Sequence, residues 1–257
     1  MRRRVRVRKL VLLTCVCLLP AASVHAAMYD LTDVDSWAII NGAIVNQYSP
    51  GPAGTGKIDT FVRLQGPHAS DIQQGYNSDG RPVQYDEDTS AQWNHSILLR
   101  DIPTVTNGGG VYLEFLLDIN QDVDTLLSLD KVEIYLETTG DLLGHPDNFS
   151  SAVYDLDAGG DNWIKLDDSI NAAGGGSGAG DMLLYVPESA FTGAENYVEG
   201  GDNYIYLYSR LGDNFSAKDG FEEWAYGVNG PIIPEPATVL LLGLGALALL
   251  RRRGAVT

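Results

Sequence analysis

The sequence predicts an all-β protein whose main part is a single antiparallel β-sandwich, jelly-roll-like in architecture. Several short segments alternate apolar and polar residues with a period of two, which places alternate side chains on opposite faces of a strand. Clusters of Gly, Asp and Asn separate these segments, as turns between strands require. Residues 27–231 contain no long amphipathic helical pattern. Short strands without covering helices bury their apolar faces by packing sheet against sheet.

The alternation is clearest in residues 111–115, 131–137 and 203–209. Weaker patterns predict further strands at residues 37–45, 58–64, 93–99, 163–166, 182–186 and 223–227. One helical turn is expected at residues 187–191, because its first residue is Pro187 and proline favours the first position of a helix.

Residues 1–26 have the organisation of a secretory signal peptide. A basic run lies before the uncharged stretch 10–19, and small or modest side chains precede Ala26. Ten apolar residues form a helix of about 15 Å, which is half the hydrocarbon core and disfavours an uncleaved anchor. We expect signal peptidase to cleave after Ala26. The mature chain then has no cysteine, because Cys15 and Cys17 lie within this segment.

The C-terminal segment, residues 232–257, is a second targeting signal. Pro234, Glu235 and Pro236 precede an uncharged run at 237–250, and a basic cluster follows it: Arg251, Arg252 and Arg253. Fourteen residues form about 21 Å of helix, which is marginal for a bilayer of about 30 Å. We expect a short transmembrane helix whose arginines stay on the cytoplasmic side. The protein would pass through an inner-membrane intermediate.

This order of features resembles the PEP-CTERM sorting signal of Gram-negative bacteria, which an N-terminal signal peptide accompanies. The resemblance covers about a tenth of the chain, from Ile232 to Thr257. It implies recognition by an exosortase, which would cut near the Pro234-Glu235-Pro236 motif. It also implies delivery to the cell surface or to the exopolysaccharide matrix. Residues 27–231 lie outside the resemblance, and they form the predicted ectodomain.

The ectodomain is strongly acidic. It contains eight Lys and Arg against 33 Asp and Glu, so its formal charge is 8 − 33 = −25. Nucleic-acid binding is excluded, because phosphate contacts need a surplus of Lys and Arg. Such a surface can bind cations or keep the protein soluble through self-repulsion.

Two acidic loops are candidate calcium sites, and no other cofactor is expected. The first has oxygen ligands at alternate positions: Asp118, Asn120, Asp122 and Asp124. It resembles the first half of an EF-hand or dockerin loop, but Val123 replaces the required glycine and Leu129 the bidentate carboxylate. The second consists of Asp155, Asp157 and Asp161 with two glycines between them. Solvated turns are the alternative for both loops.

Three alternating tyrosines form the candidate glycan site: Tyr204, Tyr206 and Tyr208. If this face of the strand is exposed, the rings can stack on sugars. The alternative is that this face packs inside the protein.

Catalysis has little support in the sequence, and we expect no enzyme. The mature chain has three histidines without a metal-binding spacing, and residues 175–179 form a glycine loop that departs from a nucleophile elbow. Glu222 and Glu223 are the remaining candidates, because glycoside hydrolysis needs two carboxyl groups. The sequence therefore favours an exported, noncatalytic surface or matrix protein. A carbohydrate-binding module is the first alternative and a glycan-active enzyme the second.

Overall fold

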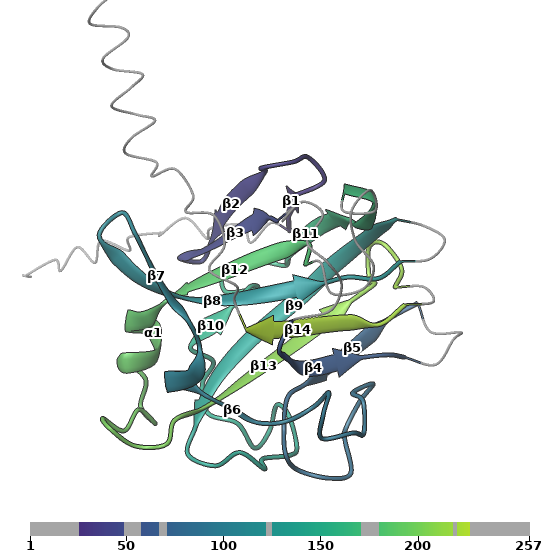
Figure 1. The fold of residues 1–257 in the computed structure, drawn as a ribbon. Helices are drawn as coiled ribbons and strands as arrows, with labels where there is room; N and C mark the ends of the chain where they lie inside the picture. Colours follow the sequence, from purple (N-terminus) through teal and green to yellow (C-terminus); the bar gives the residue numbers. More distant parts are fainter. Residues whose placement is uncertain are drawn as a thin grey trace, which may run out of the picture.

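The computed structural model of the chain describes residues 26–48, 58–66, 71–121, 125–170, 180–217 and 220–226. Within these ranges the chain forms two seven-stranded β-sheets that pack face to face, as Figure 1 shows. Helix is limited to short segments, so the predicted all-β class is confirmed.

Sheet A has the strand order β1-β11-β9-β13-β5, with β10 paired to β9 and β6 paired to β13. Its strands are β1 (Ala27–Asp30), β5 (Gln73–Tyr76), β6 (Ile97–Leu98), β9 (Leu126–Glu137), β10 (Tyr154–Asp155), β11 (Asn162–Asp167) and β13 (Tyr204–Leu211). Neighbouring strands are antiparallel except β1 and β11, which pair in parallel from Ala27 opposite Asn162. The sequence did not predict this edge strand, which begins directly after the expected cleavage site.

Sheet B has the strand order β2-β3-β12-β8-β14-β4, with β7 paired to β8. Its strands are β2 (Trp37–Ile40), β3 (Ala43–Gln47), β4 (Thr60–Leu64), β7 (Thr104–Asn107), β8 (Gly110–Asp118), β12 (Met182–Pro187) and β14 (Glu222–Tyr226). The strand expected at 37–45 is a hairpin instead. Asn41 and Gly42 both have positive φ, 49° and 88°, as a two-residue hairpin turn requires.

The inward faces of the two sheets form one apolar core. Phe115, Leu184 and Leu207 are fully buried between the sheets, and side chains of this size contribute about 1.5–3 kcal/mol each when removed from water. Polar contacts also link the two layers within the core, since the indole Nε1 of Trp224 on β14 donates a hydrogen bond to Ser209 Oγ on β13 at 3.0 Å. That bond allows Trp224 to be completely buried.

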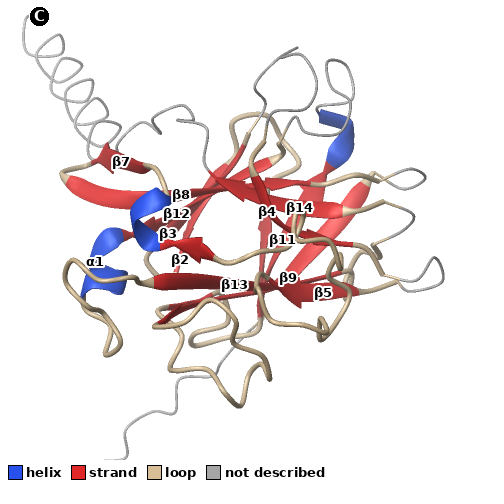
Figure 2. Ribbon diagram, turned by 60° about the horizontal axis from the view of Figure 1, so that its bottom comes forward, coloured by secondary structure: helices blue, strands red, loops and turns tan. Residues whose placement is uncertain are grey.

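Three short helical segments join the strands: η1 (Leu99–Asp101), η2 (Asp168–Ile170) and α1 (Glu188–Thr192). The predicted helical turn is α1, which Pro187 precedes, and Phe191 anchors it in the core. Figure 2 shows α1 and the β7–β8 hairpin at the same end of the molecule. Because β12 runs antiparallel to β8, Glu188 lies at this end, whereas Asp118 and Asp181 lie at the opposite end.

Candidate functional site

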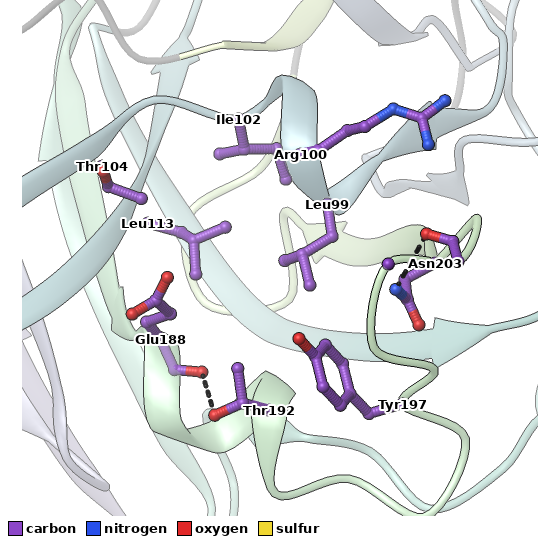
Figure 3. Close-up of a pocket in the computed structure, with 11 residues that line it drawn as sticks. Leu99, Arg100, Ile102, Thr104, Leu113, Glu188, Thr192, Tyr197 and Asn203 are labelled. Carbon is purple, nitrogen blue, oxygen red and sulfur yellow. Dashed lines mark hydrogen bonds between the residues drawn. The ribbon is translucent and has the colours of Figure 1, made fainter.

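A pocket of about 390 Å³ opens at the end of the sandwich that carries α1, and we call it the α1 pocket. It is formed where η1, β7, β8, α1 and the loop before β13 meet (Figure 3). Its lining residues are Leu99, Arg100, Ile102, Thr104, Leu113, Glu188, Thr192, Tyr197, Gly200, Gly201 and Asn203. Segments from both sheets therefore contribute to one hollow.

The α1 pocket combines an apolar floor with a few polar groups. Figure 3 shows the side chains of Leu99 and Leu113 and the hydroxyl end of Tyr197 converging on the hollow. Glu188, the first residue of α1, borders the same space, and its side chain and that of Tyr197 are both half-buried. Among the residues that the structure describes, none forms a hydrogen bond or ion pair with the Glu188 carboxylate or the Tyr197 hydroxyl. Both groups are thus available to an incoming molecule.

The loop beside Tyr197 is held by Asn203. The amide oxygen of Asn203 accepts a hydrogen bond from Val198 N at 2.8 Å, and its Nδ2 donates to Val198 O at 2.8 Å. The Asn203 carbonyl also accepts a bond from Leu99 N at 2.8 Å. This network fixes the wall of the α1 pocket before any ligand binds. Arg100 turns away from the hollow and pairs with Asp202 at the exposed rim, with Nη1–Oδ1 at 2.5 Å.

The opposite end of the sandwich contains buried carboxylates, and we call this group the acidic end: Asp118, Asp181, Glu222 and Glu223. Asp118 Oδ1 accepts a bond from Gly180 N at 2.8 Å, and Asp181 Oδ2 accepts one from Ile119 N at 2.8 Å. Glu222 Oε2 accepts a bond from Asn120 N at 3.0 Å. Asp181 and Glu222 therefore bind the backbone of the chain that leaves β8, and Asp118 binds the backbone of the chain that enters β12.

Burial, together with the neighbouring charges, raises the pKa values of the glutamates at the acidic end. Burial, with further contributions from the charges of Asp181 and Asp118, raises the pKa of Glu222 well above its usual range. Burial and the charge of Asp118 raise the pKa of Glu223 to about 7. The two side chains cannot flank one glycosidic bond, because adjacent strand residues point to opposite faces of the sheet. This pair therefore does not form the glycosidase site that was considered from the sequence.

The two predicted calcium loops differ in how much of each the structure describes. Asp118 and Asn120 lie at the acidic end, where Asn120 Nδ2 donates to Asp118 Oδ2 at 3.2 Å, whereas Asp122 and Asp124 lie outside the described residues. In the part of the chain that is described, no group of three or more His, Cys, Asp and Glu is placed to hold a metal ion. Calcium binding stays a prediction.

The second loop is a turn that its own carboxylates stabilise. Asp155 Oδ1 accepts a bond from Asp157 N at 2.8 Å, and Asp157 Oδ1 accepts one from Asn162 N at 2.9 Å. Burial, together with the nearby charges of Asp155 and Asp161, raises the pKa of Asp157 to about 6. Asp161 is exposed.

Of the two arrangements considered for the tyrosine stripe, the structure shows the one in which this face is packed inside the protein. Tyr206 is 0% exposed and Tyr208 is 5% exposed, and only Tyr204 is partly accessible. They lie on the outer face of sheet A, where Phe149 and other side chains cover them. The Tyr206 hydroxyl donates to Thr139 O at 2.7 Å and accepts from Leu142 N at 2.9 Å. The rings of Tyr206 and Tyr208 belong to a second, aromatic core and cannot stack on a sugar without unfolding it.

A buried histidine belongs to the same aromatic cluster. The His145 ring stacks on Tyr208 with centroids 4.1 Å apart, and its Nε2 lies 2.9 Å from Glu133 Oε2. Although burial opposes ionisation, hydrogen bonds from His145, Lys131 and Tyr135 lower the pKa of Glu133 to about 2. This charged cluster joins the loop after β9 to sheet A.

The sequence did not single out the α1 pocket. Glu188 was interpreted only as part of a helical turn, and Tyr197 was not considered. Their signal is spatial, since the pocket lining comes from two stretches, residues 99–113 and 188–203, that are far apart in the chain. None of the helices in the described ranges is long and apolar enough to span a membrane.

The targeting residues lie outside the described ranges, apart from Ala26: Pro234, Glu235, Pro236, Arg251, Arg252 and Arg253. Sequence comparison nevertheless identifies the tail. Residues 233–253 match the family model of the PEP-CTERM protein-sorting motif. Neither the curated proteins nor the solved structures contain a match to this chain. The C-terminus thus carries a PEP-CTERM protein-sorting motif, which implies that the protein is exported and processed by an exosortase for the surface or the extracellular space.

Proposed function

We propose that the protein is a noncatalytic structural or interaction component of the cell surface or its exopolysaccharide matrix. The observation that carries this proposal is the sorting motif at residues 233–253. In this scheme signal peptidase removes residues 1–26, and the C-terminal helix holds an intermediate in the inner membrane. The exosortase then cuts near Pro234-Glu235-Pro236.

The ectodomain suits such a role. Its charge of −25 favours solubility outside the cell and opposes association with other polyanions. The carboxylates of the acidic end bind backbone N–H groups, which is a structural use. The buried aromatic cluster on sheet A adds a second core without disulfides.

Cell fractionation tests the proposal. In the producing organism, we expect the wild-type protein in the surface or exopolysaccharide fraction, with a C-terminus shortened near Pro234. A variant with Pro234, Glu235 and Pro236 all replaced by alanine should stay with the membranes at full length. Val256→Ala is the matched control, because it changes the tail outside the matched residues. Equal surface delivery of the alanine variant would contradict the proposal, as would release of new reducing ends from exopolysaccharide by the purified protein.

A further inference from the structure

We propose that the α1 pocket binds a neutral saccharide unit of an extracellular polysaccharide. This inference rests on the proposed function, since it names the ligand class that a surface or matrix protein would hold. It replaces the tyrosine stripe, in which Tyr206 and Tyr208 are buried, with a site that is open.

The first argument is the pair of unused polar groups. The Glu188 carboxylate accepts hydrogen bonds only, whereas the Tyr197 hydroxyl can donate and accept. Neither forms a hydrogen bond or ion pair with any residue in the described part of the chain. Elsewhere in the domain, the carboxylates of Asp118, Asp181 and Glu222 accept bonds from nearby backbone. The two free groups therefore favour a ligand that presents hydroxyl groups.

The second argument is the apolar floor of the α1 pocket. Leu99, Ile102 and Leu113 line one side of a hollow of about 390 Å³, within the range of small-molecule sites. A sugar ring has an apolar C–H face and a rim of hydroxyls. Its C–H face would cover the leucines, and a hydroxyl would donate to Glu188 in a charge-assisted hydrogen bond. The phenol of Tyr197 supplies both an apolar ring and a polar end.

The third argument is electrostatic and concerns the charge of the ligand. The ectodomain carries a net charge of −25, which repels anionic polymers. The one guanidinium in the lining, that of Arg100, is already paired with Asp202 at the rim. No unpaired cation is thus left in the pocket lining to bind a sugar acid or sulfate, and a neutral saccharide fits this charge pattern.

The composition of the pocket lining favours binding of a saccharide over its hydrolysis. Glu188 is the one carboxylate among the eleven residues that line the α1 pocket. Glycosidases generally need two carboxyl groups that flank the scissile bond. The α1 pocket is therefore a site that retains a saccharide and leaves it intact.

Saturation-transfer NMR with the exported protein, purified from the producing cells, tests the inference. The probes are glucose, galactose, mannose, N-acetylglucosamine and a hydrolysate of the organism's own exopolysaccharide, with glucosamine as the cationic comparison. We expect saturable binding of at least one neutral probe. Glu188→Gln should weaken it by about tenfold, because the amide keeps an acceptor oxygen but loses the charge that strengthens the hydrogen bond. Tyr197→Phe should weaken it by about fivefold, because it removes the hydroxyl at nearly constant shape.

Glu199→Gln is the matched control, because Glu199 is exposed in the same loop and does not line the pocket. Its affinity should equal that of the wild type. Three results would overturn the inference: no neutral probe binds, binding is insensitive to both pocket variants, or only glucosamine binds. The fractionation experiment tests the sorting tail and does not depend on the α1 pocket. A protein that binds sugar but is not delivered to the surface would therefore overturn the proposed function and leave this inference standing.

Discussion

The two ends of the sandwich use carboxylates in opposite ways. At the acidic end, Asp118, Asp181 and Glu222 are buried and accept hydrogen bonds from backbone N–H groups. At the other end, Glu188 is half-buried, and no described residue binds its carboxylate. β8 connects the two ends, and the five residue steps from Leu113 to Asp118 correspond to about 17 Å. Because this chain is so acidic, the presence of a carboxylate says little about its role. Its hydrogen-bond partners distinguish a structural carboxylate from one that is available for binding.

The largest difference in stability between the two ends should come from replacing a glycine by alanine at each end. At Gly220, an added Cβ would overlap the carbonyl oxygen of Asn120, so Gly220→Ala must displace backbone. We expect a loss of about 3 kcal/mol in the free energy of unfolding. Gly200, in the loop of the α1 pocket, has φ of +69° and open space around it, so Gly200→Ala should cost only about 1 kcal/mol. Urea unfolding followed by tryptophan fluorescence measures both, and equal losses would remove the contrast in packing.

A smaller, pH-dependent effect should distinguish the acidic end. An unfolded glutamate has a pKa of about 4.3, and the folded pKa of Glu222 lies well above its usual range because of burial and the charges of Asp181 and Asp118. The folded state therefore binds more protons between these values, and wild-type stability falls as the pH rises through that interval. A glutamine at position 222 does not titrate, so it adds nothing to the pH dependence of stability.

The stability of Glu222→Gln relative to wild type should thus increase between pH 4 and pH 8. The gain is about 1.4 kcal/mol for each unit by which the pKa of Glu222 is raised. Urea unfolding at several pH values measures the difference in free energy of unfolding between the variant and the wild type. Glu223 and Asp157 titrate in both proteins, so their contributions cancel to first order. A pH-independent difference would show that Glu222 is as accessible to ionisation as an ordinary surface carboxylate.

The smallest effect on stability should come from the pocket end. Glu188→Gln removes a charge that no described residue binds, so its free energy of unfolding should stay within about 0.5 kcal/mol of wild type at pH 4 and at pH 8. The same unfolding series checks it. A loss above about 1 kcal/mol would mean that Glu188 stabilises the fold itself, and the comparison between the ends would lose its basis.

The fold class was readable from sequence because strand alternation is local. The segments at 111–115 and 131–137 lie within β8 and β9, and the segment at 203–209 matches β13 apart from its first residue. The hairpin at Asn41-Gly42 also had a local signal, the Asn-Gly dipeptide, which the prediction of one strand at 37–45 overlooked.

The sites were less readable, because their residues meet only after folding. Both faces of β13 are apolar enough to be covered, and alternation alone could not show that Phe149 covers Tyr206. The α1 pocket joins Leu99 to Glu188 and Tyr197 from two distant stretches of the chain, with no spacing that a sequence pattern could reveal. The parallel pairing of β1 with β11 is equally non-local.

The position of β14 constrains when the domain can fold. This strand is the last that the described residues form, yet it lies between β8 and β4 inside sheet B rather than at an edge. Until residues 222–226 emerge from the ribosome, β4 has no neighbour in its sheet and Trp224 is missing from the core. Residues 27–221 are thus made before the native structure of the ectodomain can close, which is compatible with the export that the sorting motif implies.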